Sequence, residues 1–200
     1  MITQKDHPEA DGPLSLIDDV PAVRLGRYQL VAEIARGGMG TVYLARLASA
    51  GGFKRLFAVK VLHPHLAQEP EFITMFLDEA RLASHLHHPN AVPIIDVCQI
   101  SSGYYLVMEY IDGFTLKNLL DELKTDSLRR IRLCLRVLVD AAAGLDAAHR
   151  LTNDDGEPIG LVHRDVSPHN ILVGTDGIGR ITDFGIARGA TRITRRSRAP

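Results

Sequence analysis

The chain has 200 residues, of which 46% are hydrophobic and 24% are charged, as is typical of a soluble globular protein. The formal net charge is −1, so neither nucleic acid nor an acidic membrane is expected as a partner on electrostatic grounds. No apolar run approaches the roughly 20 residues of a membrane helix, and the N-terminus lacks the features of a signal peptide. Cys98 and Cys134 have no metal-site spacing and are expected to be free thiols. These features together predict a cytoplasmic location.

The first half of the chain shows alternating or continuous apolar runs typical of strands, with one helical pattern among them. Residues 1–26 are acidic and proline-containing, which favours a flexible leader. Apolar residues recur at helical spacing in one long segment, which includes Phe72, Met75 and Phe76. The expected strands are 28–35, 41–47, 56–62, 92–100 and 104–111, and the expected helix is 69–86.

The second half is predicted to be mainly helical. A long helix over 127–150 carries an apolar stripe that includes Ile131, Leu135 and Leu138. The expected elements are helices over 115–123 and 127–150 and short strands over 171–174 and 180–183. The pattern therefore indicates an α+β fold with a β-rich half followed by a helical half.

A glycine-rich turn, IARGGMGTVYLA, joins the first two expected strands. Small residues between two strands allow backbone N–H groups to approach nucleotide phosphates. The usual kinase pattern is G-x-G-x-x-G-x-V, and here Ala35 stands in place of the first glycine. Alone, this motif is equally compatible with an ordinary glycine turn.

Two charged residues interrupt apolar patterns and are predicted to pair with each other. Lys60 lies inside the strand FAVKVL, and Glu79 lies on the apolar stripe of the following helix. Because a buried carboxylate needs a cation, the neighbouring Lys60 is the expected partner. The alternatives are a solvated Lys60 on an edge strand and a Glu79 that pairs with Arg81 or with local backbone.

Two further motifs follow in the second half. The segment HRDVSPHN matches H-R-D-x-x-x-x-N and places Asn170 five residues after Asp165. Asp183-Phe184-Gly185 follows Asn170 by thirteen residues. Because all four motifs occur in order on suitable elements, their combination is much more specific than any one of them.

With these motifs, residues 28–188 resemble the catalytic domain of bacterial, eukaryotic-type Ser/Thr protein kinases. The resemblance implies an antiparallel five-stranded N-lobe with one long helix and an incomplete helical C-lobe. It implies ATP and Mg²⁺ as ligands and a protein Ser or Thr as phosphoryl acceptor, and the oligomeric state stays open. The domains expected are a leader (1–26), an ATP-binding N-lobe (27–112), a partial C-lobe (113–188) and a truncated, disordered activation segment (189–200).

The resemblance also assigns roles to individual residues. Asp165 is the expected base, Lys60 with Glu79 the expected phosphate clamp, and Asn170 and Asp183 the expected Mg²⁺ ligands. Met108 corresponds to the gatekeeper, and Glu109 to Ile111 form the hinge that binds adenine. The residues assigned to nucleotide binding are Ile34, Ala35, Arg36, Gly37, Gly38, Met39, Gly40, Thr41, Val42, Ala58, Lys60, Met108, Glu109 and Ile111.

Two departures from the family pattern leave other functions open. Ser167 occupies the position where Ser/Thr kinases usually carry a lysine, and a serine brings no charge to the transferring phosphate. The family's helical body after Asp-Phe-Gly does not follow here. The alternatives are a catalytically impaired ATP-binding fragment or regulatory pseudokinase, and a small-molecule kinase of the aminoglycoside or choline type.

Overall fold

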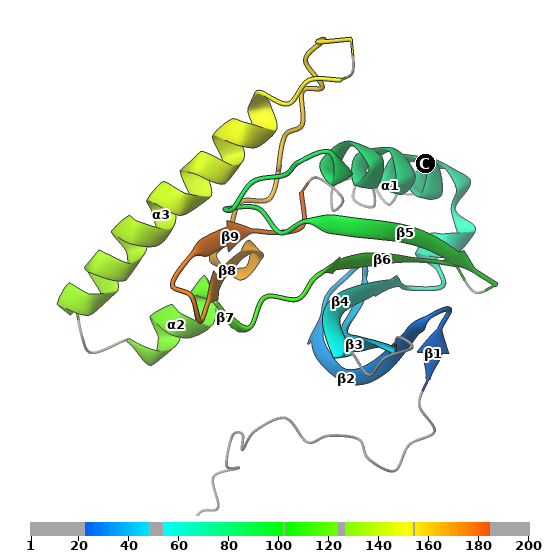
Figure 1. The fold of residues 1–200 in the computed structure, drawn as a ribbon, viewed down its shortest axis with the longest axis horizontal. Coiled ribbons are helices and arrows are strands. Elements are labelled where there is room, and N and C mark those ends of the chain that lie inside the picture. The colour runs from blue at the N-terminus through cyan, green and yellow to red at the C-terminus, as the bar shows by residue number, and fades with distance from the viewer. Residues whose placement is uncertain (1–22, 49–53, 102, 124–126, 154, 185–200) are drawn as a thin grey trace, which may run out of the picture.

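A six-stranded antiparallel sheet forms the first half of the molecule (Figure 1). The computed structural model describes residues 23–48, 54–101, 103–123, 127–153 and 155–184. In sheet order the strands are β1 (Arg24–Leu25), β2 (Tyr28–Arg36), β3 (Gly40–Ala48), β4 (Lys54–Leu62), β6 (Gly103–Glu109) and β5 (Ile94–Ile100).

The prediction of five strands and of a leader over residues 1–26 is wrong at one place. Leu25 pairs with Tyr28 across a tight turn, so β1 adds a sixth strand. Gly26 makes this turn with φ +55°, a conformation that glycine adopts without strain. Leu25 then packs against the cluster around Tyr28, which a flexible leader would not do. The other five expected strands are confirmed within two residues at each end.

One long helix, α1 (Pro70–Ser84), follows the sheet's third long strand and a 3-10 turn, η1 (Leu66–Gln68). It lies alongside β5 (Figure 1). Phe72 and Phe76 are fully buried against residues of the sheet such as Leu106. The buried side of this helix therefore belongs to the core, and Met75 on its apolar stripe packs there while partly buried.

The second half contains two helices and a small sheet. The elements are β7 (Gly113–Thr115), α2 (Leu116–Glu122), α3 (Ser127–His149), η2 (Pro168–Asn170), β8 (Ile171–Gly174) and β9 (Gly179–Ile181). The strand β7 was not predicted from the sequence. It pairs with β8 through main-chain hydrogen bonds, and its three residues show no pattern that would indicate this pairing. Helix α3 packs on β9, where Gly144 lets the helix approach the Asn90 carbonyl.

Helix α3 buries only one side. Its buried residues include Val137, Ala141 and Ala148. The apolar side chains that are more than half exposed are Leu128, Ile131, Leu135, Leu138 and Val139. None of the helices among the described residues is both long and apolar enough to span a bilayer. The expected activation segment, residues 189–200, lies outside the described part of the chain.

Candidate functional site

A short ion pair joins the two halves of the molecule. Lys60 Nζ on β4 lies 2.6 Å from Asp183 Oδ1, which follows β9. The Lys60 side chain is 10% exposed, so its charge needs an anionic partner. Asp183 has φ +60°, a left-handed conformation that is uncommon for aspartate and typical of functional sites. Two of the predicted site residues, 123 positions apart, are thus brought together.

The predicted ion pair between Lys60 and Glu79 is wrong for this structure. Glu79 Oε1 instead accepts a hydrogen bond of 2.8 Å from Arg164 Nη1, and Lys60 forms its ion pair with Asp183. The partners expected from the sequence did not include Arg164, which lies 85 residues from Glu79. Burial raises the pKa of Glu79, and the Arg164 charge only partly opposes this. The second carboxylate oxygen, Oε2, is buried without a hydrogen-bond partner among the described residues.

The loop that contains Asp165 is shaped by its own side chains. Arg164 has φ +64°, which turns the chain sharply just before Asp165. Asn170 Nδ2 donates to the Asp165 carbonyl and to Asp165 Oδ2, both at 2.9 Å. Asp165 is exposed, and within the described residues no hydrogen bond engages its other carboxylate oxygen, Oδ1. The structure therefore brings the predicted base and one predicted metal ligand into direct contact.

Below this loop, His163 connects the Asp165 and Asp183 segments. Its ring is 1% exposed, and Nε2 donates to the Thr182 carbonyl at 2.8 Å. Nδ1 accepts from the Asp165 N–H at 3.3 Å, and the ring centroid lies 4.8 Å from that of Phe184. Burial lowers the pKa of His163, and both ring contacts suit the neutral form.

The glycine turn between β2 and β3 serves two different needs. A Cβ on Gly40 would lie 2.2 Å from the Val61 carbonyl oxygen, so glycine is required there by the neighbouring strand. A Cβ on Gly37 or Gly38 would meet no atom within 4 Å. The open space over these two residues is what a phosphate group bound to backbone amides would need.

The residues expected around adenine divide into a buried and an exposed group. Val42, Ala58 and Met108 pack in one cluster, whereas Ile34 lies exposed at an irregular step of β2. The N–H of Glu109 donates to the Pro93 carbonyl at 3.1 Å, so adenine would have to use other backbone groups of the hinge. Of the remaining residues of the predicted set, Ala35 and Arg36 are exposed, Thr41 is buried, and Met39 and Ile111 are partly buried against the same cluster.

Leu172 belongs to this site but was missed from the sequence. Its neighbours Ile171 and Val173 pack toward α3, and Leu172 packs against the cluster of Ala58 and Met108. Strand alternation could have predicted this, since every second residue of β8 faces the opposite side. Leu172 thus closes the apolar cluster from the second half of the molecule.

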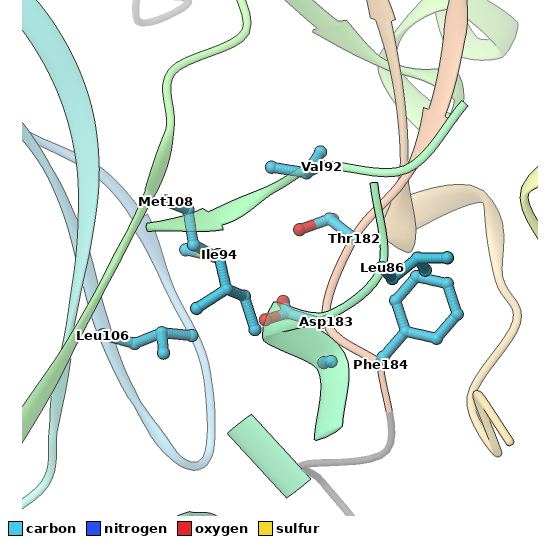
Figure 2. A pocket seen from close by; sticks show the side chains of 9 residues that line it. Leu86, Val92, Ile94, Leu106, Met108, Thr182, Asp183 and Phe184 are labelled. Atoms are coloured by element: carbon cyan, nitrogen blue, oxygen red, sulfur yellow. The ribbon is translucent and has the colours of Figure 1, made fainter. Parts of the chain in front are cut away.

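A small cavity of about 10 Å³ lies behind Met108, where the sheet, α1 and the Asp183 segment meet. Figure 2 shows the Asp183 carboxylate on the side of Ile94 and Leu106, and the Phe184 ring beside Leu86. The lining residues are Ala83, Leu86, Val92, Ile94, Leu106, Met108, Thr182, Asp183 and Phe184. Asp183 and Thr182 are therefore the two polar residues of a mainly apolar lining.

The donor set around Asp165 fits a magnesium ion. Asn170 uses its Nδ2 for Asp165, which leaves the amide oxygen as a ligand. Asp183 supplies a carboxylate that is 28% exposed, and the N–H of its neighbour Thr182 donates to the Asn170 carbonyl at 3.0 Å. Mg²⁺ in phosphoryl-transfer sites takes one or two protein oxygens and completes its shell with water and phosphates.

Comparison with known proteins agrees with this geometry. The sequence profile of the protein kinase domain matches residues 28–198. The tyrosine-protein kinase MasK of Myxococcus xanthus is 40% identical over 93% of this chain. The probable serine/threonine-protein kinase pknA2 of Bifidobacterium longum and the serine/threonine-protein kinase PrkC of Bacillus subtilis are 38% and 37% identical, each over 84% of this chain.

Solved structures give the same result. The crystal structure of the Mycobacterium tuberculosis PknI kinase domain superposes with a TM-score of 0.68 at 29% identity and covers 84% of this chain. The chain spans 61% of that domain, and 29%, 21% and 24% of the lengths of MasK, pknA2 and PrkC. The kinase-like fold predicted from the motifs is confirmed.

Proposed function

The chain belongs to the protein kinase family, and on that premise we propose that it transfers the γ-phosphoryl group of ATP to a serine or threonine of a protein. The observation that carries the proposal is the 2.6 Å contact between Lys60 Nζ and Asp183 Oδ1. It supports the proposal because the cation proposed to bind phosphate and the carboxylate proposed to bind metal lie next to each other, so that one triphosphate can contact both. The free thiols Cys98 and Cys134 are in keeping with a reaction in the cytoplasm.

The chemistry needs one proton acceptor and a means of holding charge. Asp165 Oδ1 accepts the proton of the acceptor hydroxyl. The oxygen of that hydroxyl forms a bond to the γ-phosphorus as the bond from the γ-phosphorus to ADP breaks. Asn170 holds the other carboxylate oxygen of Asp165 and so orients the base. Lys60 binds the α- and β-phosphates, and the glycine turn covers them with backbone amides.

Magnesium would be held by Asn170 Oδ1 and Asp183. When bound, the ion neutralises the charge that develops on the phosphate oxygens. Asp183 has a second task in this structure, because it also partners Lys60. Glu79 acts through Arg164, because their 2.8 Å contact helps to hold the turn that precedes Asp165.

Ser167 favours the second candidate, an ATP-binding protein with impaired transfer. In this structure the Ser167 carbonyl accepts from the Asn170 N–H, and its side chain caps no helix. The position therefore contributes no positive charge to the transferring phosphate. The relatives differ in the acceptor residue that their names state: MasK is named a tyrosine-protein kinase, whereas pknA2 and PrkC are named serine/threonine-protein kinases. Serine or threonine is therefore the proposed acceptor.

The test is Mg²⁺-dependent transfer of labelled γ-phosphate from ATP to the chain itself or to a basic protein. We expect label on serine or threonine, identified by acid hydrolysis, and its loss in Lys60→Met and in Asp165→Asn. Matched controls are Lys117→Met and Asp146→Asn, which remove a lysine and an aspartate from exposed ion pairs on α2 and α3. Both controls should retain the wild-type rate.

Each other outcome selects a different function. Label on tyrosine would correct the acceptor class. Thermal stabilisation by Mg²⁺–ATP without any transfer would select the impaired ATP-binding protein. Transfer that persists in both Lys60→Met and Asp165→Asn would refute the proposed kinase function.

A further inference from the structure

The histidine at the end of β4 contacts the glycine turn at two points. His63 Nε2 lies 2.9 Å from the Gly37 carbonyl oxygen, and the His63 backbone N–H donates to the Met39 carbonyl at 3.0 Å. Since a carbonyl oxygen only accepts, Nε2 carries the proton of this ring. The ring also stacks on His65, with centroids 5.7 Å apart and planes 20° apart.

The contact with Gly37 sets the direction of a neighbouring amide. In a planar trans peptide the carbonyl of Gly37 and the N–H of Gly38 point in opposite directions. The Gly38 N–H is therefore turned away from His63. Within the described residues it has no hydrogen-bond acceptor, and a Cβ added at Gly37 or Gly38 would meet no atom within 4 Å.

The rest of the turn is held in place as well. The Gly37 N–H donates to the Gly40 carbonyl at 2.9 Å, and Gly40 is packed against the Val61 backbone. The side chain of Met39 packs against the cluster of Ala58 and Met108. The Gly37 peptide is thus the part of the turn whose orientation depends on a side chain, and that side chain is His63.

We propose that His63 is a positioning residue of the nucleotide site: its ring holds the Gly37 carbonyl so that the Gly38 N–H is presented to a phosphate of the bound nucleotide. The inference rests on the proposed function, because it needs a nucleotide under the turn. His63 itself touches no phosphate in this proposal. Its effect is confined to the phosphate end, so the adenosine part of the nucleotide binds independently of it.

The test compares the dissociation constants of Mg²⁺–ATP and of adenosine, measured by calorimetry on the whole chain. His63→Leu should weaken Mg²⁺–ATP binding by about three- to tenfold, the effect of one lost hydrogen bond, and leave adenosine binding unchanged. His63→Gln places an amide N–H near the position of Nε2 and should restore Mg²⁺–ATP affinity. His63→Asn is polar but too short to reach Gly37, and it should behave like His63→Leu.

His85→Leu is the matched control. The His85 ring also donates to a backbone carbonyl, that of Arg81 at 2.8 Å, but on α1 and away from the glycine turn. It should leave both affinities unchanged. An equal loss for Mg²⁺–ATP and adenosine in the His63 variants, or unchanged Mg²⁺–ATP affinity in both His63→Leu and His63→Asn, would overturn the proposal.

Failure of the proposed function gives a different result. If the wild-type chain binds neither Mg²⁺–ATP nor adenosine, the nucleotide site itself is refuted, and this role of His63 with it. If the wild-type chain binds both and His63→Asn matches it, only the role of His63 is refuted. Thermal unfolding without nucleotide identifies any variant that has lost its fold.

Discussion

Helices α1 and α3 use their apolar faces in opposite ways. Helix α1 leaves none of Phe72, Phe76 and Ala80 exposed, because the sheet covers that face. Helix α3 is longer, yet Leu135 and Leu138 on its apolar stripe are 62% and 55% exposed. Figure 1 shows the same contrast, with α1 lying along the sheet and much of α3 extending beyond the small sheet.

This contrast shows which properties of a helix hydrophobic periodicity can predict. A 3.6-residue period predicts that a segment is helical and which of its faces is apolar. It does not identify the element that covers the face. In α3 the side that is covered is built from small residues such as Ala141, Gly144 and Ala148, because β9 and the Asn90 segment approach closely there.

The largest expected effect is the contrast between truncations on these two helices. Phe76→Ala removes a fully buried ring and should lower the free energy of unfolding by about 3–5 kcal/mol. Leu135→Ala removes a mainly exposed side chain and should change it by no more than about 0.5 kcal/mol. Urea unfolding followed by circular dichroism measures both.

Equal losses of stability in the two variants would contradict this expectation, because they would mean that the α3 stripe is covered in solution. In that case sedimentation velocity would have to show a species larger than the monomer. Loss of that species in Leu135→Glu would locate the cover on α3.

A smaller contrast is expected inside the glycine turn. Gly40→Ala places a Cβ 2.2 Å from the Val61 oxygen, and the β3–β4 ladder has to move, at a cost of about 1–3 kcal/mol. Gly38→Ala meets open space and should change stability by less than about 0.5 kcal/mol. Thermal unfolding without nucleotide tests this. A Gly38→Ala variant as unstable as Gly40→Ala would show that the open space is filled.

Much of the fold and the identity of the site residues could be predicted because they depend on local patterns. The alternation in β2 to β6 and the period of α1 are properties of short segments. The motifs around Lys60, Asp165 and Asp183 have fixed spacing, so each could be recognised alone. Leu172 was also within reach, through the alternation of β8.

What could not be predicted were partners that are far apart in sequence. Lys60, Glu79, Arg164 and Asp183 are two cations and two anions in a small volume, and sequence alone allows more than one pairing. The choice depends on the left-handed turns at Arg164 and Asp183, which place the two side chains. The strands β1 and β7 were missed because their two and three residues show no apolar alternation in the sequence.

A more gradual effect is expected from pH, at the contact between the two halves. His163 is neutral in the fold, and burial lowers its pKa below the ordinary value of 6.5. As pH falls below about 6.5, the unfolded chain takes up a proton there and the folded chain does not. The free energy of unfolding should therefore fall, by up to about 1.4 kcal/mol per pH unit, until the folded pKa is reached.

The measurement is urea unfolding of the wild type and of His163→Gln between pH 7.5 and 5, and the informative quantity is the difference between their slopes. Glu79 acts in the opposite direction, because its raised pKa lets the folded state take up a proton first as pH falls below the raised value. That contribution is present in both proteins and cancels in the difference. His163→Gln should be less stable at pH 7.5, where the Thr182 and Phe184 contacts are altered, and should lose less on acidification. Parallel slopes would mean that His163 is protonated inside the fold, and the hydrogen bond from the Asp165 N–H to Nδ1 would then be excluded.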